Sequence, residues 1–184
     1  MDFNDTPEEA KFRKEAYDWL KANAPLKEGP KDSWRAASEE EGLKEVKAWQ
    51  KKLHDGGWAC LHWPKQYGGR ESTPIERVIW GQEVSKFKVP GGYLEIGQGM
   101  AGPVMMMYAT EEQKERYLPP LATGEEIWCQ LFSEPAAGSD VAGIKTKAEL
   151  DGDTWTINGQ KVWTSGAHFS DYGILVTRSD PTVA

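Results

Sequence analysis

The stretch that decides the fold is Ile127–Gly143, IWCQLFSEPAAGSDVAG. Its largely apolar first six residues predict a short strand over 127–132. The strand must stop by Pro135, because proline cannot donate to a strand ladder. The residues from there to Asp140 are small, so a flat or phosphorylated ligand can approach the backbone N–H groups. An ordinary Gly-Ser-Asp turn is the alternative interpretation.

A second segment, QKVWTSGA over 160–167, predicts another strand end. Trp163 and Ser165 are two positions apart, so a strand would place them on one side. An aromatic plane beside a hydroxyl and free amides suits a planar heterocycle with carbonyls and ring nitrogens. A buried structural tryptophan is the alternative.

The chain before these strands is predicted to be helical. Capping boxes, each a threonine followed three residues later by Glu or Gln, predict helix starts after Thr6, Thr73 and Thr110. The last of these helices is expected to end at Pro119-Pro120. Another helix is predicted from about Ala36 to the Gly56-Gly57 pair.

Past residue 126 the hydrophobic period changes from helical to alternating. Strands are predicted around tight turns at Asp151-Gly152 and Asn158-Gly159, and again over Tyr172–Thr177. Four short strands are too few to close a barrel. The predicted fold class is α+β multidomain, with an all-α domain over 1–125 and an incomplete, antiparallel, β-barrel-like domain over 126–184.

Composition excludes several classes of function. A net charge of −7 over 184 residues argues against nucleic-acid binding. No run of 18 apolar residues occurs, so no membrane insertion is predicted, and the charged N-terminus predicts a cytoplasmic protein without a signal peptide. Two cysteines and three scattered histidines predict neither a disulfide framework nor a metal site.

Three further patterns have both functional and structural interpretations. Gly97–Gly102, GQGMAG, fits G-x-G-x-x-G, but no strand precedes it, so close helix packing or an adaptable apolar pocket wall is preferred to a dinucleotide site. Met105–Met107 are expected in the core more than in an acyl cavity. Ser139-Asp140 with a distant histidine suggests a hydrolase, but G-x-S-x-G is absent.

The combination of FSEPAAGSDVAG, INGQKVWTSGA and GWACLHWPKQYGG, the last over Gly57–Gly69, closely resembles the acyl-CoA dehydrogenase family. The three blocks occur in the order and spacing of the family, and the resemblance covers essentially the whole chain. It implies an FAD enzyme with an N-terminal helical domain (1–125) and a middle β-domain (126–184 being its first part). A C-terminal four-helix domain comes after these two in the family.

The resemblance also implies roles for individual residues. Ser133 would meet the pyrimidine edge of the flavin, Ser165 its N5 and O4 atoms, and Trp163 would shield the ring face. Ser139 would serve the phosphates and also bind the acyl-CoA substrate. The full set implied to bind FAD is Gln130, Phe132, Ser133, Gly138, Ser139, Trp163, Thr164 and Ser165.

The reaction implied is α,β-dehydrogenation of an acyl-CoA thioester to the trans-2-enoyl-CoA, as in fatty-acid β-oxidation. No catalytic residue is predicted within the chain, because the family's base, usually a glutamate, is expected beyond Ala184. The 184-residue chain alone is therefore expected to be inactive. An electron-transfer flavoprotein is the implied acceptor, and a homo-oligomer, dimer or tetramer, the implied assembly.

Other functions stay open at this point. A non-catalytic module that binds flavin or assembles subunits is one alternative. An acyl-CoA oxidase or a flavoenzyme like nitroalkane oxidase is another, and oxygen reactivity of the reduced flavin separates these from a dehydrogenase.

Overall fold

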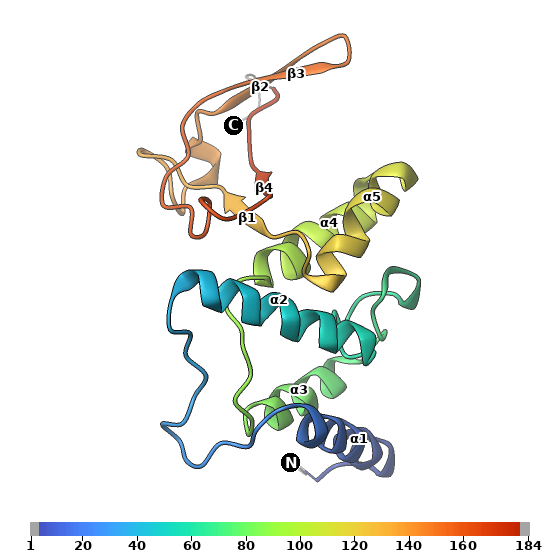
Figure 1. Cartoon of the computed structure of the whole chain (residues 1–184). Coiled ribbons are helices and arrows are strands. Elements are labelled where there is room, and N and C mark those ends of the chain that lie inside the picture. Colours follow the sequence, from blue (N-terminus) through green and yellow to red (C-terminus); the bar gives the residue numbers. More distant parts are fainter. Residues whose placement is uncertain (1–3, 181–184) are drawn as a thin grey trace.

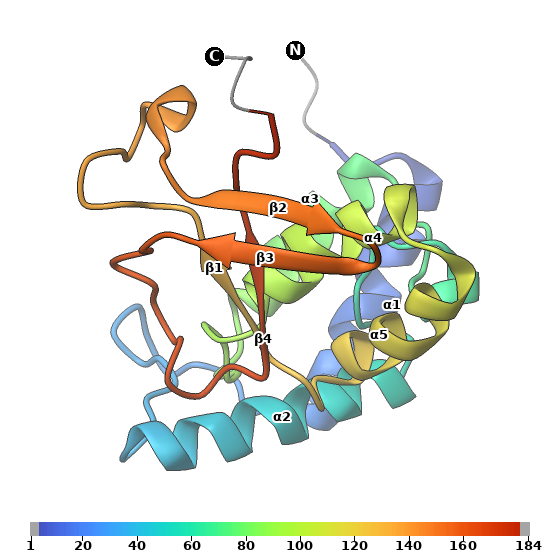
Figure 2. The ribbon, with the colours of Figure 1, turned by 90° about the horizontal axis from the view of Figure 1, so that it is seen from above.

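The computed structural model describes residues 4–180, with helices at one end and strands at the other (Figure 1). Figure 2 looks down on the strand end, with the β2–β3 hairpin nearest the viewer. The elements in chain order are α1 (Pro7–Asn23), α2 (Glu39–Asp55), η1 (Lys65–Tyr67), α3 (Pro74–Val84), η2 (Gly97–Ala101), α4 (Gly102–Tyr108), α5 (Glu111–Thr123), β1 (Trp128–Leu131), η3 (Val141–Gly143), β2 (Lys147–Asp151), β3 (Thr154–Asn158) and β4 (Tyr172–Leu175).

The predicted capping boxes start three of the helices. The side chains of Thr6, Thr73 and Thr110 each accept from the backbone three residues on, and the Glu or Gln there accepts from the cap. Each box satisfies two helix N–H groups that would otherwise lack a partner. Helix α2 starts at Glu39, three residues later than predicted, because Ser38 supplies its cap.

Helix α5 does not end at Pro119-Pro120 as predicted but continues to Thr123. Tertiary contacts stabilise the turn that follows the two prolines. The amide side chains of Gln50 and Gln98 donate to the carbonyls of the last turn, at 2.8 Å and 3.0 Å. The apolar face of this turn is buried, and Gly124 in the left-handed conformation ends the helix.

Tryptophan builds much of the helical core. Four of the nine tryptophans, Trp19, Trp49, Trp58 and Trp80, form one connected cluster between α1, α2 and α3. Trp58 and Trp80 stack with ring centroids 4.5 Å apart. Such offset aromatic pairs contribute about 0.5–1.5 kcal/mol beyond the burial of their surface.

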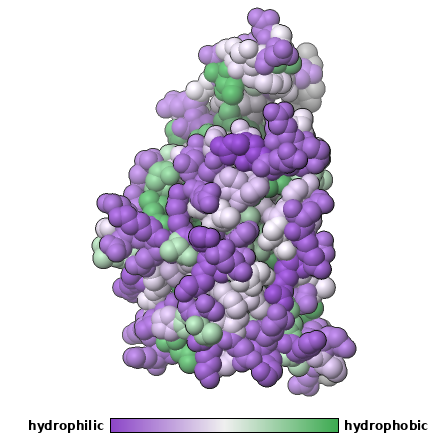
Figure 3. All heavy atoms as spheres, turned by 45° about the vertical axis from the view of Figure 1, so that its right-hand side comes forward, coloured by the Kyte–Doolittle hydropathy of each residue, from purple (hydrophilic) through white to green (hydrophobic). Residues whose placement is uncertain are grey.

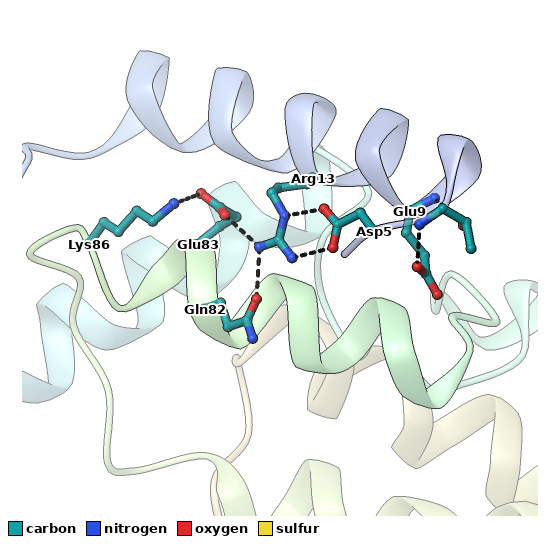
Figure 4. A network of polar contacts seen from close by, with 7 residues as sticks. Asp5, Glu9, Arg13, Gln82, Glu83 and Lys86 are labelled. Atoms are coloured by element: carbon teal, nitrogen blue, oxygen red, sulfur yellow. Dashed lines mark hydrogen bonds and ion pairs between the residues drawn. The ribbon is translucent and has the colours of Figure 1, made fainter. Parts of the chain in front are cut away.

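A polar network joins α1 to α3 within this half (Figure 4). The Glu83 carboxylate, 1% exposed, accepts from Arg13 at 2.9 Å and from Lys86 at 2.6 Å. Arg13 also binds Asp5 and Gln82. Burial raises the pKa of Glu83, but the hydrogen bonds from Lys86 and Arg13 outweigh it, so the pKa lies below its usual value.

The glycine-rich segment serves close packing, as predicted. A Cβ on Gly97 would lie 2.5 Å from Leu121, and one on Gly102 would lie 2.2 Å from Trp63. The absence of these side chains lets η2 and α4 approach α5 and the buried Trp63 indole. Met105 and Met106 pack against the buried residues around Trp63, whereas Met107 is 71% exposed, so the predicted core position is wrong for Met107.

The strands form two separate pairs. β2 and β3 are antiparallel, joined by a turn at Gly152-Asp153, one residue later than predicted. β1 and β4 are parallel, with Gln130 opposite Ile174. The predicted antiparallel arrangement is therefore wrong for this pair, because the long connection between β1 and β4 allows a parallel return. No closed barrel forms within residues 4–180, and the barrel of a complete domain stays a prediction.

The face in Figure 3 is mostly hydrophilic, with small separate hydrophobic areas. The helices of the described residues are all too short or too polar to cross a bilayer.

We expect Arg13→Met to destabilise the fold more than Lys14→Met, its neighbour on α1. Arg13→Met leaves the buried Glu83 with one cation fewer and should cost about 2 kcal/mol. The Lys14–Asp18 pair is largely exposed, so its loss should cost below about 0.5 kcal/mol. Urea unfolding measures both, and equal midpoints would contradict the importance of the network.

Gly102→Ala and Gly99→Ala test the packing of the glycine segment. The new methyl at 102 meets the buried Trp63 ring and should destabilise by about 1–3 kcal/mol. Nothing lies within 4 Å of a Cβ at Gly99, so that variant should unfold at the wild-type temperature or above. Thermal unfolding followed by circular dichroism compares them, and a stable Gly102→Ala protein would refute the close approach.

Candidate functional site

The end of β1 carries the candidate site. After Leu131 the chain leaves the strand, and a tight loop closes when Glu134 and Ala137 exchange backbone hydrogen bonds of 2.8 Å and 3.2 Å. These bonds satisfy the inner backbone groups of the loop. Phe132 and Ser133 thereby lie between the strand and a fixed turn.

Glu134 is the polar centre of this region. Its carboxylate, 4% exposed, accepts from the backbone N–H of Lys145 at 2.6 Å and of Thr146 at 2.9 Å, and from Lys161 Nζ at 2.8 Å. The Lys161 hydrogen bond, with further bonds from Thr146 and Lys145, lowers the pKa of Glu134 to about 2. The group is therefore ionised at all ordinary pH values.

Lys161 joins the two segments that were predicted to form the site. Its ammonium also donates to the carbonyl of Phe132 at 2.9 Å, and Val162 N donates to the carbonyl of Ser133, likewise at 2.9 Å. The side chain of Lys161 is only 7% exposed. Segment 161–162 is thus fixed beside residues 132–134.

Two adjoining cavities lie along this junction, with volumes of about 410 Å³ and about 210 Å³. Both are lined by Gln130, Phe132, Ser133 and Trp163. The larger adds Gly138, Ser139, Val141, Ile144 and Val176, and the smaller adds Ile96, Val162 and Ser165.

The structure therefore brings together every residue of the predicted set except Thr164, which lines neither cavity. The convergence of Ser133 and Ser165, on which the interpretation depended, is present. The predicted strand through Trp163 is wrong, because residues 159–164 are irregular. Trp163 adopts a φ of +54°, a conformation that a bulky residue rarely takes outside sites of strain.

Trp163 is 83% exposed, so the alternative of a buried structural tryptophan is also wrong. The segment after it is held against the helices. His168 meets Glu39 at 2.7 Å, and the Phe169 ring packs on Tyr93 with centroids 5.4 Å apart. The exposed indole thus stands on a segment anchored at both ends.

Several hydrogen-bond donors around the cavities have no partner among residues 4–180. Within the described part of the chain, the backbone N–H of Ser133 and the hydroxyls of Ser133, Ser139 and Ser165 have no protein partner. A Cβ at Gly138 would meet nothing within 4 Å, so the wall is open there. Unpaired donors beside an exposed aromatic plane suit a planar ligand rich in acceptors.

Sequence reasoning missed Lys161 and the role of Glu134. A charged residue at the end of each apolar run, Glu134 in the first motif and Lys161 in the second, was the available signal, since such charges are rarely buried without a partner. Ile96 had no signal, because it comes from the helical half of the chain.

Among residues 4–180, no group of three or more His, Cys, Asp or Glu side chains can hold a metal ion. Both cysteines are buried, and burial raises the pKa of Cys60 to about 12, which suppresses its nucleophilicity.

Comparison with known proteins identifies the family. The family model described as acyl-CoA dehydrogenase, N-terminal domain, matches residues 6–125, and that of the middle domain matches residues 129–183. Acyl-CoA dehydrogenase IpdE1 of Mycobacterium tuberculosis is 42% identical over 142 residues, 77% of this chain and 37% of that protein. IpdE1 of Mycolicibacterium smegmatis is 38% identical over 186 residues, 92% of this chain and 46% of that protein.

Two solved structures are similar to this chain in fold. The structure titled "Tcur3481-Tcur3483 steroid ACAD" superposes with a TM-score of 0.75 at 31% identity, covering 100% of this chain and 46% of that one. The ChsE4-ChsE5 complex from Mycobacterium tuberculosis gives a TM-score of 0.71 at 31% identity, covering 98% of this chain and 44% of that one. The chain spans less than half the length of these relatives, and it belongs to the acyl-CoA dehydrogenase family.

Proposed function

We propose that the protein is the flavin-binding part of an FAD-dependent acyl-CoA dehydrogenase. The observation that carries this proposal is the pair of cavities that share Gln130, Phe132, Ser133 and Trp163. Their unpaired N–H and hydroxyl donors match the carbonyls and ring nitrogens of an isoalloxazine, and the open wall at Gly138 gives phosphate groups room. Membership of an FAD-dependent family supports the choice of cofactor.

Each residue has a separate task in this proposal. The Ser133 N–H and hydroxyl would donate to the pyrimidine edge, where reduction places negative charge. One such preorganised donor typically lowers the barrier by about 3 kcal/mol. Ser165 would donate near N5 and O4, and the Trp163 indole would keep water from the ring face. Gly138 and Ser139 would admit the phosphates, and Ser139 would also contact the acyl-CoA.

Bound FAD would supply the hydride acceptor for α,β-dehydrogenation of an acyl-CoA thioester to the trans-2-enoyl-CoA. A base must remove the α-proton. Glu134 does not suit this role, because it is buried, held by three donors and has a pKa of about 2. The base is expected beyond Ala184, which lies outside the described residues.

The partners belong to the same proposal. We take acyl-CoA as substrate, an electron-transfer flavoprotein as acceptor, and a homo-oligomer as assembly. The titles of the two similar structures each name a pair of different proteins, so a heteromer is the alternative. Light scattering of the purified protein, alone and after mixing with candidate subunits, separates the two assemblies.

The function is tested on the protein that carries this chain, loaded with FAD under anaerobic conditions. Addition of acyl-CoA should bleach the flavin absorbance and yield enoyl-CoA by mass spectrometry. A straight-chain and a steroid side-chain acyl-CoA are the first substrates to compare. Stable FAD binding without bleaching by acyl-CoA or release of enoyl-CoA would favour a non-catalytic module. Rapid reoxidation by oxygen would favour an oxidase, and failure to bind FAD would refute the proposal.

We expect Trp163→Ala to weaken FAD binding about tenfold, because loss of an aromatic contact costs about 1.4 kcal/mol. Trp155→Ala is the matched control, since Trp155 is also exposed but lines neither cavity. Titration of the apoprotein with FAD, followed by quenching of flavin fluorescence, measures both affinities. Equal affinities for the two variants would remove Trp163 from the site.

A further inference from the structure

We propose that Lys161 is a positioning residue that polarises the Phe132–Ser133 peptide. It thereby strengthens the Ser133 N–H as a donor toward the two adjoining cavities that Ser133 lines. This inference rests on the proposed function. It starts from one contact that the ion pair with Glu134 does not require. The buried ammonium donates to Phe132 O at 2.9 Å as well as to the Glu134 carboxylate at 2.8 Å.

The carbonyl that Lys161 holds and the N–H of Ser133 belong to the same peptide unit. Resonance couples them, so a cation on the oxygen draws electron density from the nitrogen and makes its hydrogen more positive. The peptide is trans, as are all those in the described range, so the N–H points away from the carbonyl that Lys161 binds. Lys161 thus lies behind the peptide, and the Ser133 N–H faces away from it.

The next peptide along the chain is fixed as well. Val162 N donates to the carbonyl of Ser133 at 2.9 Å, so both peptide units of Ser133 are held from segment 161–162. The Ser133 N–H nevertheless has no acceptor among residues 4–180, although Ser133 lines both cavities. A donor that is held, polarised and unpaired is prepared for an external acceptor.

The consequence is a preference for reduced flavin. Negative charge at the pyrimidine edge grows on reduction, and a charge-assisted hydrogen bond is about twice as strong as a neutral one. Lys161 therefore stabilises the reduced form more than the oxidised form. A role limited to holding the loop would change the affinity for both forms equally.

The experiment compares Glu134→Gln with the double variant Glu134→Gln/Lys161→Met, because neither then leaves a buried carboxylate without its cation. Spectroelectrochemical titration of the FAD-loaded protein gives the preference for reduced over oxidised flavin. We expect the preference for reduced flavin to be about fivefold smaller in the double variant than in Glu134→Gln. This corresponds to a reduction potential lower by about 20 mV for a two-electron couple. The amide proton of Ser133 should also shift upfield in the apoprotein by NMR.

Two controls keep the result interpretable. Lys161→Arg retains a cation and should retain most of the preference. Lys147→Met removes an exposed lysine of β2 and should leave the preference unchanged. Equal preferences in Glu134→Gln and the double variant would overturn the inference, whereas wild-type protein that binds no FAD would overturn the proposed function instead.

The single variant gives an independent check if the double variant does not fold. Without the Glu134 charge, the Lys161 ammonium is no longer neutralised by an anionic acceptor and polarises the Phe132 carbonyl more strongly, so Glu134→Gln should raise the preference for reduced flavin above wild type. An unchanged or lower preference in Glu134→Gln would count against the inference.

Discussion

The buried ion pair between Glu134 and Lys161 is the contact on which the strand half of the molecule depends. Two backbone N–H groups complete the carboxylate's partners, and a backbone carbonyl occupies a second donor of the ammonium. A buried pair without such additional bonds would not recover the cost of its desolvation. With them, one pair fixes three chain segments, 132–134, 145–146 and 161–162, around the two cavities.

This arrangement explains why an irregular segment can line a precise site. Residues 159–164 form no strand, yet Lys161 anchors one side of Trp163, and contacts of His168 and Phe169 with the helical half anchor the other side. Between these anchors Trp163 takes a left-handed backbone and leaves its indole exposed. Strain at an exposed aromatic residue is typical of a ligand-binding position.

The helical half supports the strands and contributes Ile96 to the wall of the smaller cavity. Its tryptophan cluster and the Arg13–Glu83 network hold α1 and α3 together, and the glycine segment brings α4 against α5. Helix α5 leads almost directly into β1, so its position determines where β1 begins. Ile96, immediately before η2, reaches the smaller cavity and links the helices to the candidate flavin site.

The sequence alone determined the elements whose signals are local. Capping boxes depend on side chains three residues apart, so the starts of α1, α3 and α5 were predictable. The motif around Ser133 and the one around Trp163 likewise identified most of the residues that line the cavities. Family resemblance, rather than periodicity, connected these motifs with flavin.

Tertiary structure decided the features that depend on distant partners. Helix α5 passes Pro119-Pro120 because Gln50 and Gln98 bind its last carbonyls, and neither glutamine is near it in sequence. Three other features depend in the same way on residues far along the chain. They are the parallel β1–β4 pair, the irregular path through Trp163 and the two contacts of Lys161. Local propensity cannot encode such contacts, because their energy exists only once the chain has folded.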